Sequence, residues 1–313
     1  MEEVVKSSAV IRRKSKIYHA NAMSPVSYYV LVTLLGLTSL LCVLPLLLVI
    51  SVSFSAESNI LRDGYRFIPE VFSVEAYRFL IDDLDKITTG YGISILVTVV
   101  GTFLSLLVTS LFAYPVSRPD FPYRNQFSFI VFFTMLFGGG LVPWYLLYTQ
   151  AGLKNTLLAL IIPHLVVPFN VIIMRIFFTN TIPHALIESA KIDGAGELRI
   201  YSKIILPLSL PVLATIGLFQ MLAFWNDWYT SLIFINNPKL VSLQYLLYKV
   251  ISDLNYINSG TATIQAANAV QETLPSETAK MAMAVIGIGP IIMVYPFLQN
   301  YLVKGLTVGS VKG

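Results

Sequence analysis

The sequence predicts an all-α polytopic membrane protein with six transmembrane helices, and its composition, hydropathy and segment lengths all support this class. Hydrophobic residues make up 56% of the 313 positions, whereas charged residues make up only 12%. The mean hydropathy is +0.72, far above the usual value for a soluble domain. Six apolar windows of roughly 20 residues or more are long enough to cross about 30 Å of hydrocarbon as helices.

The six predicted spans are separated by more polar connections. Their approximate ranges are 28–54, 91–116, 127–148, 156–178, 208–235 and 281–302. The first span follows basic residues, but it is too long for a cleaved secretory signal and has no small-residue cleavage site. The third span contains Gly138, Gly139, Gly140 and Pro143, so we expect it to be a broken or kinked helix.

Basic residues in the short connections predict the orientation of the spans. With an even number of spans both termini lie on one side, which we expect to be the cytoplasm because it collects most of the Lys and Arg residues. Thirteen of the 21 fall there, namely Lys6, Arg12, Arg13, Lys14, Lys16, Arg118, Arg124, Arg175, Lys191, Arg199, Lys203, Lys304 and Lys312. The opposite side carries the acidic patch Asp82, Asp83 and Asp85 and the longer loops 55–90 and 236–280.

We expect three regions along the chain. A basic N-terminal segment, 1–27, and a short C-terminal tail, 305–313, are cytoplasmic, and the six-helix domain, 28–304, lies between them. Between the fourth and fifth spans this domain contains a polar interruption, residues 182–211, that reads IPHALIESAKIDGAGELRIYSKIILPLSLP. The pattern leaves two interpretations open: a solvated loop resting on the membrane surface, or an ordered element that another protein grips.

Local chemistry predicts two short helices at an angle within the interruption. Pro183 suits the first turn of a helix, and Glu188 and Lys191 stand at a spacing that places them on one face. The run Asp193 to Gly196 then ends that helix, because glycine adopts the left-handed backbone at little steric cost. A second, amphipathic helix is expected over about 197–206, with an apolar stripe formed by Leu198, Tyr201, Ile204 and Ile205.

The residues of the interruption resemble the EAA signature of permease subunits in binding-protein-dependent ABC importers. Glu188, Ser189 and Ala190 are followed after two residues by Asp193 and Gly194, and after nine more by the run from Ile204 to Pro207. The one departure is Ser189, which replaces the first alanine of the signature. The segments 295–313, 137–155 and 218–235 are similar to carbohydrate-importer permeases of the maltose and oligosaccharide type.

This resemblance implies the ABC importer type I permease fold, with the interruption as the cytoplasmic coupling-helix loop. It also implies import of a carbohydrate, with an oligosaccharide favoured, by alternating access across a bacterial plasma membrane. The implied partners are two ABC ATPase subunits, a second, non-identical but homologous permease, and an extracytoplasmic sugar-binding protein. The implied ATPase-coupling residues are Glu188, Ser189, Ala190, Asp193, Gly194, Ala195, Leu206 and Pro207. The tail 305–313 is expected to touch the ATPase pair.

Several chemistries have no support in the sequence. The chain has no G-x-x-x-x-G-K-[S/T] phosphate loop, so we expect no enzymatic activity and no cofactor here, and ATP and Mg²⁺ to bind the partner ATPases. His19, His164 and His184 have no Cys, Asp or Glu at ligand spacing, which argues against a metal site. The net charge of +4 reflects membrane orientation rather than a nucleic-acid surface.

Polar and aromatic residues inside the spans are candidates for the substrate path. Trp225, Asn226, Asp227 and Trp228 lie within the fifth span, where aromatic faces would stack on sugar rings and Asn and Asp would bind hydroxyls. The alternative is that the indoles anchor the helix at the outer interface and that Asp227 braces a gate. Two deeper amides complete the candidate set, Asn170 and Gln220, for which a hydrogen bond between helices is the alternative role.

Three other functions stay open on the sequence. The EAA-like motif is shared by importers of phosphate, amino acids and peptides, so a non-sugar solute is one alternative. A secondary transporter would show matched discontinuous helices and intramembrane ion ligands, and only the third span is expected to be broken. A membrane enzyme acting on lipid-linked sugars would have only Glu188, Asp193 and Glu197 as cytoplasmic catalytic acids.

Overall fold

The computed structural model describes residues 24–82, 84–258 and 276–308. In this part of the chain helices dominate, and the one β contact is an isolated bridge between Ser55 and Phe72. Three helices are long and apolar enough to cross a membrane, and three bent helix pairs raise the number of spans to six if each pair counts as one. The predicted all-α class with up to six spans is therefore confirmed. The predicted N-terminal segment and C-terminal tail lie largely outside the described residues.

The described helices have the following bounds. In chain order they are α2 (Pro25–Ser53), α3 (Glu57–Asp63), α4 (Glu75–Ile81), α5 (Leu84–Ser117), α6 (Arg124–Leu136), α7 (Leu141–Gln150), α8 (Leu157–Ile161), η1 (Ile162–His164), α9 (Pro168–Thr181), α10 (His184–Ile192), α11 (Glu197–Ile200), η2 (Tyr201–Ile205), α12 (Leu206–Leu208), α13 (Leu210–Trp225), α14 (Tyr229–Phe234), η3 (Pro238–Leu240), α15 (Leu243–Asn258) and α17 (Ser276–Val308). Of these η2 is a π-helix, and η1 and η3 are 3₁₀ helices.

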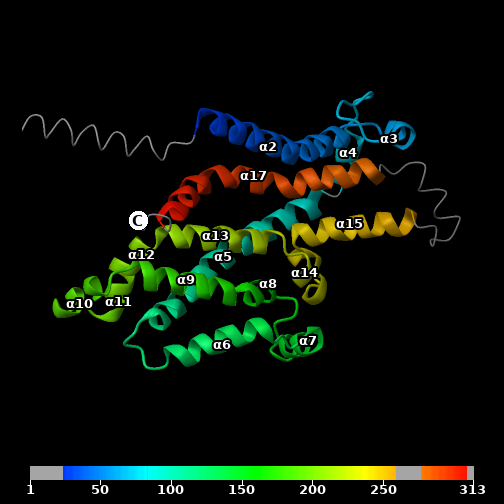
Figure 1. Cartoon of the computed structure of the whole chain (residues 1–313). Helices are drawn as coiled ribbons and strands as arrows, with labels where there is room; N and C mark the ends of the chain where they lie inside the picture. Colours follow the sequence, from blue (N-terminus) through cyan, green and yellow to red (C-terminus); the bar gives the residue numbers. More distant parts are fainter. Residues whose placement is uncertain (1–23, 83, 259–275, 309–313) are drawn as a thin grey trace, which may run out of the picture.

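Three unbroken helices account for the first, second and sixth predicted spans. The helix α5 is the longest, with 34 residues, and at about 1.5 Å per residue it is roughly 50 Å long. It packs against α9 and α13, whereas α2 lies beside α17 on one side of the bundle (Figure 1). The most apolar window of α2 is only 11% buried, compared with 39% for α5. Most of the surface of α2 is therefore open to contacts outside this chain.

The third predicted span is broken, as its glycines indicate. The helices α6 and α7 meet at 116° across residues 137–140, where Gly140 has φ +79°. The fourth span is bent by 50° between η1 and α9.

The prediction of one continuous fifth helix over 208–235 was wrong. The helix α13 ends at Trp225, and α14 begins only at Tyr229. The carboxylate of Asp227 accepts the backbone N–H of Thr230 at 3.0 Å, so this side chain supplies a hydrogen bond that a continuing helix would have taken from its backbone. The apolar helix is thereby interrupted within the predicted span.

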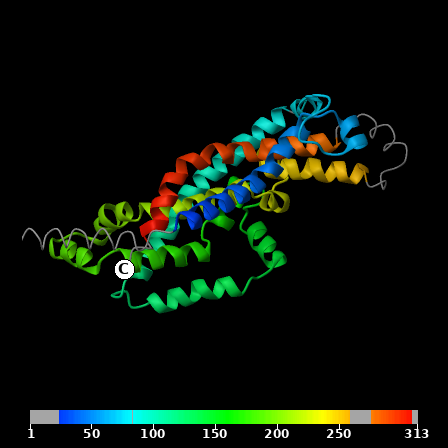
Figure 2. The ribbon, with the colours of Figure 1, turned by 45° about the horizontal axis from the view of Figure 1, so that its top comes forward.

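The described parts of the two predicted long loops fold at one end of the bundle, and the polar interruption folds at the other (Figure 1). The helices α3, α4 and α15 gather around the first turns of α5 and α17, whereas α10, α11 and α12 project beyond the end of α9. A view turned by 45° has the same arrangement (Figure 2). We call the end that carries the interruption the loop end, and the end with α3, α4 and α15 the far end.

A carboxylate from α3 caps the beginning of α17 at the far end. The side chain of Glu57 accepts the backbone N–H groups of Glu277 and Thr278 at 2.8 and 2.9 Å. It also accepts the hydroxyls of Ser276 and Thr278. Because the first turn of a helix has unpaired N–H groups and a partial positive charge, this contact stabilises the start of α17.

Candidate coupling loop and translocation path

The interruption folds as the two-helix turn that its sequence predicts. The helix α10 ends where Gly194 takes φ +78°, the left-handed conformation expected for glycine at this position. The backbone N–H of Gly194 bonds to the carbonyl of Lys191, and that of Ala195 bonds to the carbonyl of Ala190 at 2.9 Å. A Cβ on Gly194 would meet nothing within 4 Å. Glycine is therefore required here for the backbone turn and not for packing within this chain.

The second helix of the interruption differs from the predicted one. It is α-helical only to Ile200 and continues as a π-helix to Ile205. Tyr201 and Ile205 are buried as expected, but Leu198 is 78% exposed and the unpredicted Ile200 is fully buried. Residues two apart point to widely different sides of a helix, so Leu198 cannot share the buried face of Ile200, and its place in the apolar stripe was wrong.

The predicted coupling residues divide between exposed positions and partly buried ones. Glu188, Ser189, Asp193, Gly194 and Pro207 are exposed, whereas Ala190, Ala195 and Leu206 pack on the apolar cluster beneath the loop. Their contact with an ATPase stays a prediction.

Two exposed apolar residues lie on either side of the turn, and neither was predicted to belong to the coupling surface. Ile192, at the end of α10, is 86% exposed, and Leu198 in α11 is 78% exposed. Both stand within four positions of Gly194 in the sequence, and this placement beside a predicted turn is the signal that could have identified them. The turn therefore presents apolar side chains to its surroundings, which is the usual composition of a docking surface.

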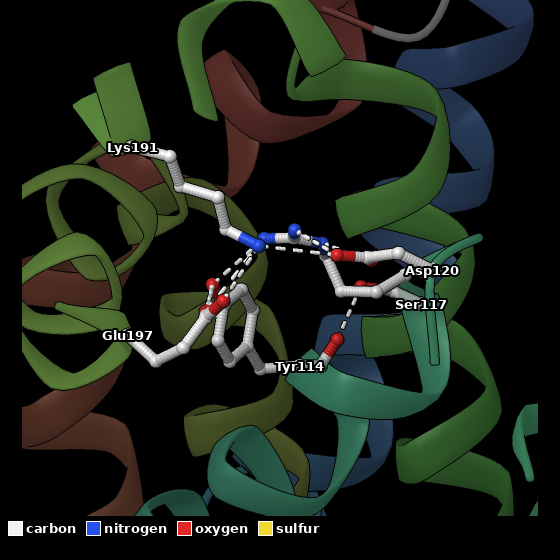
Figure 3. A network of polar contacts seen from close by, with 6 residues as sticks. Tyr114, Ser117, Asp120, Lys191 and Glu197 are labelled. Carbon is white, nitrogen blue, oxygen red and sulfur yellow. Dashed lines mark hydrogen bonds and ion pairs between the residues drawn. The ribbon is translucent and has the colours of Figure 1, made fainter. Parts of the chain in front are cut away.

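A cluster of charged side chains fastens the loop helices to the end of α5 (Figure 3). The guanidinium of Arg118 donates to both carboxylate oxygens of Asp120, at 2.9 and 2.7 Å, and to the hydroxyl of Tyr114 at 3.0 Å. That hydroxyl donates to Glu197 at 2.6 Å. The ammonium of Lys191 lies 3.1 Å from Asp120 and 2.9 Å from Glu197. We call these five residues the α5 clamp.

The α5 clamp balances two positive and two negative charges, and Arg118 is only 8% exposed. The hydrogen bonds that Arg118 donates lower the pKa of Asp120 to about 2. A carboxyl with a depressed pKa contributes stability that is present at neutral pH and is lost only as the pH falls from its ordinary pKa toward the depressed one. The clamp is therefore fully charged near neutrality. The hollow beside it, about 400 Å³, is lined by Leu111, Pro115, Phe121, Leu198 and Tyr201 as well as clamp residues.

Three of the candidate path residues are buried within the chain. Gln220 is 1% exposed and donates its amide N–H to the carbonyl of His164 at 3.0 Å and to the hydroxyl of Ser105. Trp225 is 5% exposed, and its indole N–H donates to the carbonyl of Gly287 in α17 at 2.9 Å. Asn170 is 4% exposed. The polar groups of Gln220 and Trp225 thus already join helices of this chain.

The other candidates lie at the break between α13 and α14. Asn226 is exposed, and its amide donates to the carbonyl of Leu222 at 2.8 Å. The ring of Trp228 stacks on Tyr248 of α15, with centroids 4.1 Å apart. Contact of any of these six residues with a substrate stays a prediction.

Asp227 pairs with a histidine that looked isolated in the sequence. A carboxylate oxygen of Asp227 lies 3.2 Å from Nε2 of His164, and the two side chains are 11% and 29% exposed. His164 stands at the bend of the fourth span and Asp227 at the break of the fifth, so this contact joins two interrupted spans. In the described part of the chain no group of three or more His, Cys, Asp or Glu residues is arranged to hold a metal ion.

Apolar spans, three of them bent, and an exposed two-helix turn at one end define a helical membrane transport protein of the permease class. The chain belongs to the family described as the binding-protein-dependent transport system inner membrane component, whose model matches residues 26–308. The protein is thus a membrane permease that works with other transporter components.

Several relatives are similar in sequence to most of the chain. The polygalacturonan/rhamnogalacturonan transport system permease protein YtcP of Bacillus subtilis is 40% identical over 88% of this chain and 94% of its own length. The arabinooligosaccharides transport system permease protein AraQ of Halalkalibacterium halodurans is 29% identical over 93% and 98%. A chain in the crystal structure of a bacterial ABC transporter involved in the import of the acidic polysaccharide alginate aligns with a TM-score of 0.75 and 31% identity, covering 88% of this chain and 96% of that one.

Proposed function

We propose that this chain is one permease of an ATP-driven importer that moves an oligosaccharide into the cytoplasm by alternating access. It would pair with a second, homologous permease, with two ATPase subunits that bind ATP and Mg²⁺, and with an extracytoplasmic sugar-binding protein. The observation that carries the proposal is the exposed turn of the interruption, which presents apolar side chains while clamped to a long membrane helix. ATP hydrolysis would take place in the partner subunits.

The loop end would face the cytoplasm. It carries Arg118, Arg124, Arg175, Lys191, Arg199 and Lys203 in the described part of the chain, and basic residues near spans are enriched on the cytoplasmic side. The proposed docking of ATPase subunits at the loop end also requires this end to face the cytoplasm, where the ATPases would bind ATP. The far end, with α3, α4 and α15, would then receive the sugar-binding protein.

The turn of the interruption would be the docking element. Ile192 and Leu198 would enter an apolar groove on the ATPase, and Glu188 and Asp193 would make polar contacts at its rim. The left-handed Gly194 sets the angle between the two helices and keeps the turn free of side-chain bulk. Closure of the ATPases on ATP would then move the loop.

The names of the relatives support a carbohydrate substrate and indicate which sugars to test first. Polygalacturonan and alginate are acidic polymers, whereas arabinooligosaccharides are neutral. We therefore propose uronate-containing oligosaccharides as the first class to test, with neutral oligosaccharides as the second. A phosphate, amino-acid or peptide substrate is the alternative that the same experiment rejects or supports.

The test is reconstitution of the whole complex in proteoliposomes. Uronate or neutral oligosaccharides, together with the binding protein, should stimulate ATP hydrolysis and enter the vesicles. Stimulation by a phosphate, amino-acid or peptide solute and by none of these sugars would overturn the assignment. In the same assay Gly194→Leu should abolish stimulation with insertion intact.

Two control variants separate the effects of Gly194→Leu. Gly194→Ala imposes a similar backbone strain without the bulk, so it should retain more activity. Gly152→Leu is a matched control at φ +70°, because its Cβ would also meet nothing within 4 Å. Full stimulation in Gly194→Leu would contradict docking through the turn.

A further inference from the structure

The polar side-chain contacts of the loop helices connect them to one membrane helix, α5, and to the residues that follow it. In the described residues, side-chain hydrogen bonds and ion pairs from residues 184–205 to other parts of the chain reach only Ser110, Tyr114, Arg118 and Asp120. The first two lie on α5, and the last two follow its end. Apolar contacts beneath the loop are shared among α5, α9 and α13, so direction-specific attachment is concentrated on α5.

Arg118 holds the centre of this attachment. Its guanidinium binds Asp120 through two parallel hydrogen bonds and Tyr114 through a third, and it lies 3.8 Å from Glu197. A planar guanidinium with several donors fixes its partners in one geometry, which the single ammonium of a lysine does not do. A buried charge is stable only when it is paired, so the partners cannot separate freely from Arg118. Tyr114 and Asp120 in turn bind Glu197 and Lys191, so Arg118 ties the loop helices to the end of α5.

The other end of α5 is fixed to the far end of the bundle. The backbone N–H of Leu243, the first residue of α15, donates to the hydroxyl of Ser94 at 2.9 Å. A Cβ on Gly90 would lie 3.3 Å from Cα of Leu243, so the two backbones approach closely there. One unbroken helix thus contacts both the loop helices and α15.

We propose that Arg118 is a positioning residue: by holding the loop helices against the end of α5, it makes α5 the rigid connection between the loop helices and the far end. A displacement of the loop by the ATPases is carried by the α5 clamp into α5 and reaches α15 along it. In the opposite direction, docking of a binding protein on the far end biases the position of the loop. This inference rests on the proposed function and adds the route and the residue through which the two ends are coupled.

The test compares Arg118→Gln with Arg124→Gln in the purified complex. In the described residues the guanidinium of Arg124 has no hydrogen bond or ion pair, so this substitution is a matched control six positions along. Arg118→Gln should leave ATPase subunits bound and basal hydrolysis unchanged, and should lower stimulation by the loaded binding protein at least about fivefold. Arg124→Gln should match the wild type. Unchanged stimulation in Arg118→Gln would overturn the proposal.

Tyr114→Phe keeps the test decisive if Arg118→Gln fails to assemble. It removes only the hydroxyl between Arg118 and Glu197 and keeps the ring packing, so the complex should form and stimulation should fall. The double variant should be stimulated as much as Arg118→Gln alone, because both substitutions break the same connection between α5 and the loop helices. Wild-type stimulation in Tyr114→Phe, or multiplicative effects in the double variant, would overturn the proposal.

Hydrogen exchange gives a readout that does not depend on the substrate. In Arg118→Gln the amides of residues 184–205 should exchange faster, while those in the middle of α5 should not change. Unchanged exchange of the amides of residues 184–205 would refute the claim that Arg118 holds the loop helices. If the wild-type complex is stimulated by no sugar, the proposed function fails, and this measurement still decides whether Arg118 holds the loop.

Discussion

Replacement of Asp227 distinguishes a sugar-binding carboxylate from a structural one. The side chain accepts the N–H of Thr230 at 3.0 Å and lies 3.2 Å from Nε2 of His164. Asp227→Ala leaves both groups without this partner, and an unpaired buried polar group costs about 1–3 kcal/mol. Because His164 is 29% exposed and regains water in part, we expect a total loss of about 2–4 kcal/mol.

Thermal unfolding of the purified complex and uptake of a series of oligosaccharides give the two readouts for Asp227. Asp227→Ala should lower the unfolding temperature, and Asp227→Asn should lower it less, because the amide oxygen can still accept from Thr230. The preference among sugars should not change in either variant. Asn226→Ala at the same break is the control, and its exposed side chain should contribute less than about 0.5 kcal/mol. An altered sugar preference with wild-type stability would refute the structural role.

Three further predictions concern packing, capping and the tail. Gly101→Ala should destabilise the protein by about 1–3 kcal/mol, because its Cβ would lie 2.6 Å from the ring of Phe224. Gly92→Ala on the same helix meets nothing within 4 Å and should be neutral or stabilising, and thermal unfolding of both variants checks this. Glu57→Ala should lower stability by about 1–2 kcal/mol, with faster amide exchange confined to the first turn of α17. Deletion of residues 307–313 should lower sugar-stimulated ATP hydrolysis, and unchanged coupling with normal assembly would reject contact of the tail with the ATPases.

Local chemistry made most of the fold predictable. Length and hydropathy identified the spans, since a helix that crosses hydrocarbon must be long and apolar whatever its neighbours are. Consecutive glycines likewise revealed the break between α6 and α7. The break after Trp225 was missed, because most of the surrounding residues are apolar and the break depends on which groups the side chain of Asp227 contacts. That side chain caps Thr230 and meets His164, which lies 63 positions earlier.

The same division applies to the coupling loop. The left-handed Gly194 was predictable, because a helix stop is decided within a few residues. The α5 clamp was not, because Tyr114 lies 83 positions from Glu197 and Asp120 lies 71 from Lys191. Sequence periodicity carries no information about pairs so far apart. The charged pair Arg118 and Asp120 directly after an apolar span was the one available signal.

The cap on α17 has a consequence for the order in which the protein is completed. Glu57 is made early in synthesis, yet its partner Ser276 follows 219 positions later. A contact of this sequence separation is expected to form late, because the two ends of a long chain segment must be brought together first. Until then the first turn of α17 has no capping carboxylate. This contact at the far end is therefore expected to close late, and it joins the first loop of the chain to its last described helix.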